Sequence, residues 1–170
     1  SMPKEEIETR TPLLKDPKEM REHELVVNDL MARLKPLGWL KKHETEVLEL
    51  PTLLHLKTKF EVSGCAKRDP ELVRLLHPTP ALGVSPRAYG FQWMRELSDQ
   101  KDRGLFGAPM LFSISNDETL ALVAIRSILW DENGSKVGSG CGLVASSELE
   151  REWGELAAKR RTLFNLLGLV

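Results

Sequence analysis

The stretch Leu76-His77-Pro78-Thr79-Pro80-Ala81 lies near the middle of this 170-residue chain and separates two runs of helix and strand patterns. Proline fixes φ and lacks a backbone N–H donor, so the stretch can neither continue a helix nor lie inside a sheet. We therefore expect a stiff loop here. Ser85-Pro86 follows as an N-cap and a first-turn proline, which predicts a helix over residues 85–97. Such a helix start would offer N–H groups to an anion, although an ordinary proline-rich connector is the simpler explanation.

The chain before this loop begins with a polar stretch, residues 1–14, which we expect to be a flexible N-terminal arm. Apolar residues then recur at helical spacing over residues 16–34, where Asp16-Pro17 provides a cap. Alternating polar and apolar residues predict strands at 46–50 and 53–62. Asp69-Pro70 opens a short helix that is expected to end near Leu76.

The chain after the loop repeats this order of elements. Beyond the 85–97 helix, three strands are predicted at 109–114, 120–130 and 135–144, joined by turns at Asn116-Asp117 and Asn133-Gly134. A long helix is predicted over 146–167, with Ser146 or Ser147 as its cap. Helices that alternate with hairpins indicate an α+β fold with antiparallel sheet.

The composition limits the classes of function. The net charge of −1 gives no electrostatic footprint for nucleic acid or for an acidic membrane surface. No signal peptide or long apolar span is recognisable, and Cys65 and Cys141 have no metal-ligand spacing. These features predict a cytoplasmic protein with reduced thiols.

Two pairs of glutamates are the strongest candidates for chemistry. Glu19 and Glu22 lie on the first long helix, and Glu152 and Glu155 lie on the last. The i, i+3 spacing puts both carboxylates of each pair on one helix face. If the two faces meet, they form an oxygen-rich site for a hard cation such as Mg²⁺. Solvated helix faces are the ordinary alternative for each pair taken alone.

Three further residues have side chains or backbone suited to an anionic ligand. Arg126 ends the apolar run 120–125, where its guanidinium could meet a carboxylate, and Lys159 lies one turn beyond Glu155. The glycines around Gly140 indicate close approach to a ligand. The ordinary alternatives are a strand-edge charge for Arg126 and a helix-dipole partner for Lys159. His55, in an alternating strand, is more typical of a hydrogen-bonded structural residue.

Seven stretches of the chain resemble, in order, the chorismate-utilising enzymes, and most closely the isochorismate synthases. They include His77-Pro78-Thr79-Pro80 and Glu152-Trp153-Gly154-Glu155, and together they cover nearly the whole chain. The matching stretches are residues 18–27, 51–56, 76–82, 102–107, 124–126, 140–144 and 152–155 with Lys159.

The resemblance implies half of the duplicated α/β/β/α sandwich of that family, with residues 15–170 as the C-terminal portion of the chorismate-binding domain. It further implies a role for each candidate residue. Glu22 and Glu155 resemble the family's Mg²⁺ ligands, and Glu19 and Glu152 resemble their supporting shell. The groups that bind the substrate carboxylates resemble Arg126, Gly140 and Lys159. Ala81 and Leu82 resemble pocket-wall residues, and His55 resembles an active-site histidine.

The implied function is the Mg²⁺-dependent conversion of chorismate to isochorismate, by addition of water to the ring and loss of the hydroxyl. The His-Pro-Thr-Pro loop favours a water-using isochorismate or salicylate synthase over the ammonia-using relatives. The family's lysine base and glutamic acid belong to the N-terminal half, and neither has a match here. We therefore expect the isolated chain to be inactive and to need the missing half or self-association. The alternatives are a non-catalytic module that binds a ligand or a protein, and a salicylate synthase fragment.

Overall fold

The computed structural model describes residues 2–3, 11–50, 53–97 and 103–169. The chain divides into two compact units, and each is described by itself. Unit 1 contains residues 1–66 and 140–170, and unit 2 contains residues 67–139. Within the described residues, none of the helices is long and apolar enough to cross a membrane.

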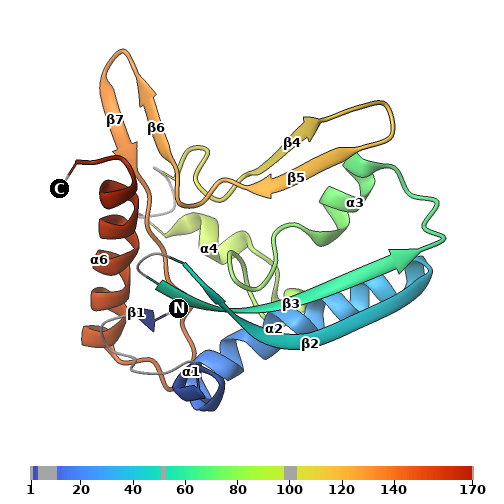
Figure 1. Cartoon of the computed structure of the whole chain (residues 1–170), viewed down its shortest axis with the longest axis horizontal. Helices are drawn as coiled ribbons and strands as arrows, with labels where there is room; N and C mark the ends of the chain where they lie inside the picture. The colour runs from blue at the N-terminus through green and yellow to red at the C-terminus, as the bar shows by residue number, and fades with distance from the viewer. Residues whose placement is uncertain (1, 4–10, 51–52, 98–102, 170) are drawn as a thin grey trace. The chain divides into compact units, whose positions relative to one another are not determined.

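Unit 1 is built on an antiparallel sheet with one long helix lying along it (Figure 1). Strands β2 (Trp39–Glu49) and β3 (Leu53–Ser63) pair over most of their length, and β1 (Met2–Pro3) pairs with the other edge of β3. Helix α2 (Pro17–Leu34) is followed by the short helix η2 (Lys35–Leu37), which leads into β2. The predicted helix and both predicted strands are present, and β2 begins seven residues before the start predicted for it, residue 46.

A polar chain of side chains ties α2 to this sheet. His23 Nε2 lies 2.7 Å from Thr58 Oγ1 on β3, which lies 2.8 Å from Thr45 Oγ1 on β2. Burial lowers the pKa of His23, and the Lys42 ammonium group lowers it further. The ring is therefore held neutral near pH 7, which suits a hydrogen-bonded position between helix and sheet.

The stretch predicted as a flexible arm, residues 1–14, contains regular elements in the part that the structure describes. Helix α1 (Thr11–Lys15) begins within it, and β1 is a strand of the sheet. Leu13 is fully buried against Leu54, so the local core includes a residue assigned to the arm. A polar composition concealed this because one buried leucine is enough to anchor a short helix.

Unit 1 closes with helix α6 (Leu149–Leu166), whose N-cap is Glu148. The predicted caps Ser146 and Ser147 are wrong by one or two positions. The Ser147 hydroxyl instead accepts a hydrogen bond from the Val144 N–H at 3.1 Å, within the turn that precedes the helix. Side-chain bonding to the local backbone competes with capping for serine.

The described residues of unit 2 form three short helices: α3 (Asp69–Leu76), η3 (Arg87–Tyr89) and α4 (Gln92–Glu96). The predicted helix α3 and the following loop are present. The single helix predicted over 85–97 is wrong, because Gly90 ends η3 with φ of 70°, a conformation that breaks a helix. The helix start considered there as an anion site is therefore absent from the described residues, since η3 has only three residues, which agrees with the simpler explanation of a proline-rich connector.

Two hairpins complete unit 2: β4 (Pro109–Ser113) with β5 (Thr119–Val123), and β6 (Ile128–Asp131) with β7 (Gly134–Val137). Both predicted turns join strands. The strand predicted over 120–130 is instead two strands, because the Ile125 N–H bonds back to Val123 O and Arg126 takes φ of 53°. The strand predicted over 135–144 ends at Val137. The fold class is α+β with antiparallel pairing, as predicted, but the strands among the described residues form three sheets.

Candidate metal and carboxylate site

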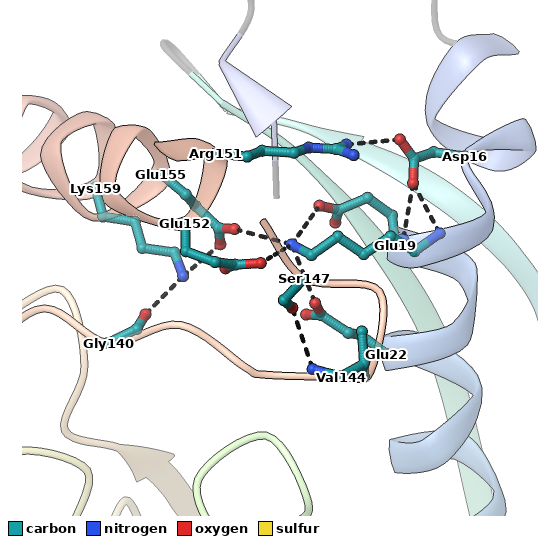
Figure 2. A network of polar contacts seen from close by, with 11 residues as sticks. Asp16, Glu19, Glu22, Gly140, Val144, Ser147, Arg151, Glu152, Glu155 and Lys159 are labelled. Atoms are coloured by element: carbon teal, nitrogen blue, oxygen red, sulfur yellow. Dashed lines mark hydrogen bonds and ion pairs between the residues drawn. The ribbon is translucent and has the colours of Figure 1, made fainter. Parts of the chain in front are cut away.

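The two predicted glutamate pairs meet in unit 1. Figure 2 shows Glu19 and Glu22 from α2 and Glu152 and Glu155 from α6 pointing toward one another. Glu19, Glu152 and Glu155 are 4–7% exposed, and the Glu22 side chain is 24% exposed. Carboxylates are almost never buried without partners, so the cluster needs positive charge.

Lys18 supplies that charge from the first turn of α2. Its Nζ lies 2.8 Å from Glu152 Oε1, 3.2 Å from Glu22 Oε1, 3.7 Å from Glu155 Oε2 and 4.0 Å from Glu19 Oε1. The lysine is itself only 6% exposed. One ammonium group therefore bridges carboxylates of both helices.

Burial and charge act against each other in this cluster. Burial disfavours the charged form of Lys18, but the carboxylates of Glu152 and Glu22 outweigh it and raise the pKa of the ammonium group. Burial raises the pKa of Glu22 despite the nearby Lys18. Burial also raises the pKa of the Cys141 thiol, and the negative charge of Glu152 adds to that effect. Lys18 is therefore a permanent cation, and Cys141 is a neutral thiol beside the cluster.

Lys159 is the second cation of the cluster. Its Nζ lies 2.5 Å from Glu155 Oε1 and donates a hydrogen bond of 2.7 Å to Gly140 O. Burial alone would raise the pKa of Glu155. The surrounding positive charges, including Lys159 and Lys18, outweigh burial and bring this pKa below its usual value. Lys159 and Gly140, each predicted as a carboxylate-binding group, are therefore in direct contact at the edge of the glutamate cluster.

A capping network fixes how the two helices approach each other. The carboxylate of Asp16 accepts hydrogen bonds from the Lys18 and Glu19 N–H groups at 2.9 and 3.0 Å, which caps α2. Its second oxygen accepts a bond of 2.6 Å from Arg151 Nη2 on α6 (Figure 2). Asp16 thus joins the start of α2 to the first turn of α6, at the positions next to the glutamates.

The donor set fits a Mg²⁺ ion in chemistry. Four carboxylates and two ammonium groups leave an excess of two negative charges, and carboxylate oxygens are the protein ligands that Mg²⁺ prefers. Both oxygens of Glu152 and Oε1 of Glu22 are buried without a well-formed hydrogen bond in the described part of the chain. As arranged, however, no three acidic, histidine or cysteine side chains among the described residues are close enough together to hold a metal ion. The Lys18 ammonium group lies between them.

The remaining predicted residues lie elsewhere in the two units. His55 is half-buried on β3, opposite Leu48 on β2. Ala81, Leu82 and Arg126 belong to unit 2, where Leu82 O accepts a hydrogen bond from Arg103. Arg126 lies between β5 and β6. The roles expected of these residues remain predictions.

Three residues of the network escaped the sequence analysis: Lys18, Asp16 as a partner of α6, and Arg151. The available signal for Lys18 was its i, i+4 spacing to Glu22, which marks an ion pair on a helix face. No comparable signal existed for Arg151 and Asp16, because the two residues are 135 positions apart in the sequence.

Comparison with known proteins gives a consistent result. The model of the family described as chorismate-binding enzyme matches residues 1–168. The isochorismate synthase of Escherichia coli is 34% identical over 161 residues, which cover 92% of this chain and 41% of that protein. The salicylate biosynthesis isochorismate synthase of Pseudomonas aeruginosa is 33% identical over 92% of this chain and 34% of its own length.

A relative with a different named activity and a solved structure are also similar to this chain. Anthranilate synthase component 1 of Neisseria gonorrhoeae is 28% identical over 99% of this chain. The crystal structure of a 2,3-dihydroxybenzoate-specific isochorismate synthase of Bacillus anthracis superposes with a TM-score of 0.76 at 30% identity, covering 95% of this chain and 44% of that one. The chain thus spans about two-fifths of the length of its isochorismate synthase relatives, and it belongs to the chorismate-binding enzyme family.

Proposed function

We propose that this chain is the Mg²⁺- and chorismate-binding portion of an isochorismate synthase, with residues 15–170 as the C-terminal part of its domain. The observation that carries the proposal is the meeting of Glu19 and Glu22 with Glu152 and Glu155 beside Lys159. Burying such a cluster costs free energy. Binding a divalent cation together with a dicarboxylate substrate is a function that requires these charged groups.

The residues divide the work of binding between them. Glu22 and Glu155 would hold the ion, with Glu19 and Glu152 supporting them, and the ion when bound supplies positive charge for a substrate carboxylate. The Lys159 ammonium group, positioned by Glu155 and Gly140 O, would offer its positive charge to a carboxylate of chorismate. Arg126 is the proposed partner of the other carboxylate, with Ala81 and Leu82 as pocket wall and His55 as an active-site histidine.

The proposed activity requires a partner polypeptide. The relatives are more than twice as long as the part that this chain covers. Hairpin β4–β5 has one face made entirely of apolar side chains that are 39–46% exposed: Met110, Phe112, Leu120 and Leu122. We assign this face to contact with the polypeptide that corresponds to the rest of the relatives, which also contributes the base and the acid. The cytoplasm is the proposed compartment, since Cys65 and Cys141 are free thiols.

The test is chorismate binding by titration calorimetry in MgCl₂ and in EDTA. We expect Mg²⁺-dependent binding that Lys159→Met weakens at least tenfold. Arg161→Met removes an exposed charge from the same helix and should bind like the wild type. Mixing the chain with the N-terminal portion of a relative should then yield isochorismate, detected by chromatography. Absence of both binding and product would refute the proposal.

A non-catalytic binding module is the second candidate. It is favoured by the position of Lys18, whose ammonium group neutralises the carboxylates where an ion would be held. The missing counterparts of the family's base and acid agree with it. This candidate predicts binding of chorismate or of a protein without turnover in any mixture, so the product assay separates the two.

A further inference from the structure

We propose that Lys18 is a displaceable counter-ion that sets the metal affinity of the glutamate cluster. In the absence of Mg²⁺ its ammonium group keeps the four carboxylates together, and it leaves the centre of the cluster when the ion enters. This inference rests on the proposed assignment of the cluster as a Mg²⁺ site, and it adds a residue that competes with the metal.

The Lys18 ammonium group lies at the centre of the glutamate cluster. Lys18 Nζ lies within 4.0 Å of an oxygen of every one of the four glutamates, two on each helix. Mg²⁺ binds oxygen at about 2.1 Å and demands near-octahedral geometry. Nζ lies 3.2 Å from Glu22 Oε1 and 3.7 Å from Glu155 Oε2, and these are the two carboxylates proposed to hold the ion. Ion and ammonium group therefore exclude each other.

The Lys18 ammonium group also reduces the negative charge of the cluster. With Lys18 in place, the cluster carries an excess of two negative charges, and without it the excess is three. A divalent cation entering beside an ammonium group meets direct repulsion, which is strong where water is excluded. Removal of the ammonium group therefore raises the affinity of the cluster for Mg²⁺.

The carboxylates, and not the dipole of α2, favour the ammonium group of Lys18 at this position. Lys18 lies in the first turn of α2, where the helix dipole disfavours a positive charge. Its flexible four-carbon stem allows the strongly hydrated head to move when the carboxylates are taken by another cation.

The test is titration of MgCl₂ into the wild type, Lys18→Met and Lys35→Met at constant ionic strength, followed by calorimetry. Lys35 is exposed at the other end of α2, so its variant removes the same charge far from the cluster. We expect Lys18→Met to bind Mg²⁺ at least tenfold more tightly than the wild type and Lys35→Met to match the wild type. Equal or weaker binding by folded Lys18→Met, or none, overturns the inference.

A second measurement uses the wild type and stands if Lys18→Met does not fold. The side-chain nitrogen resonance of Lys18, assigned by its loss in Lys18→Arg, should move to the position of an exposed lysine as Mg²⁺ saturates the protein. A resonance unchanged at saturation overturns the inference. Neither measurement uses chorismate, so failure of chorismate binding leaves both readable and is attributed to the proposed function alone.

Discussion

Burying Lys18 among carboxylates removes charged groups from water, and only close ion pairing replaces the lost hydration. Removing one partner of such a cluster costs more than the pair contributes, because it changes the balance of charges that stay buried. The sequence predicted the glutamates from their spacing. It could not predict that a lysine from the same helix would be buried between them, because lysine side chains are mostly exposed.

Loss of the strongest Lys18 partner should therefore destabilise the fold. We expect Glu152→Gln, which keeps the shape of the side chain, to lower the free energy of unfolding by about 1–3 kcal/mol. Glu150→Gln on the exposed side of the same helix turn is the matched control and should change it by less than about 0.5 kcal/mol. Urea denaturation measures both, and equal stability of the two variants would contradict the buried ion pair.

His77, in the proline-rich loop, should make stability depend on pH. Burial and the positive charges of Arg103 and Arg87 lower its pKa in the folded state below the usual 6.5. The unfolded chain then binds more protons between the two pKa values, so stability falls as pH drops below about 6.5. We expect His77→Asn to flatten this part of the stability–pH curve, measured by urea midpoints from pH 7.5 to 5. An unaltered slope would show that other groups dominate.

Among the elements, the long and strongly patterned ones were predictable and the irregular ones were not. Helices α2 and α3 have Asx-Pro starts, and β3 alternates cleanly, so local signals agree with the fold. The 85–97 helix failed because the positive φ of Gly90 interrupts it. The 120–130 strand failed at Arg126, where an apolar run continues past the end of β5 and periodicity gives no stop signal.

The joint between α2 and α6 can be tested through Asp16 and Arg151. Asp16→Ala removes the cap and the contact with Arg151 and should cost about 1–2 kcal/mol. Asp16→Asn keeps a capping oxygen, so we expect it to lose only the pair, about 0.5–1 kcal/mol. A double-mutant cycle with Arg151→Met isolates the coupling, and purely additive free energies of unfolding would refute a direct link between the helices.

The same carboxylate should contribute to acid sensitivity. Burial alone would raise the pKa of Asp16, but the Glu19 N–H and the Arg151 guanidinium lower it below 3.8. Its contribution to stability is therefore complete above about pH 4 and is lost as pH falls through the lowered value. Comparing Asp16→Asn with the wild type in acid denaturation should show the two curves converging only in strongly acidic solution.

At the scale of the whole molecule, the apolar face of hairpin β4–β5 is the clearest sign of incomplete burial. Monomeric proteins rarely leave such a face in contact with water. The resemblance of the chain to half of a sandwich predicts this need for a partner. It could not show which strands stay uncovered, because that depends on the cross-strand pairing of Phe112 with Leu120 and of Met110 with Leu122.

The chain on its own should therefore self-associate as its concentration rises. We expect Phe112→Thr combined with Leu120→Thr to shift light-scattering masses toward the monomer, because threonine keeps strand propensity while removing apolar surface. Leu48→Thr on β2 replaces a single exposed leucine of unit 1 and serves as control. A concentration-independent monomer mass for the wild type would contradict the prediction and the proposed role of this face.

Unit 1 is assembled from two stretches of chain, residues 1–66 and 140–170, which are separated in the sequence by the whole of unit 2. During synthesis α2 emerges from the ribosome long before α6. Lys18 and Glu19 therefore stay hydrated, without their partners on α6, until that last helix has been made. Contacts between such distant positions form slowly. The glutamate cluster is thus a late acquisition of the nascent polypeptide, and a chain released before residue 149 would lack it altogether.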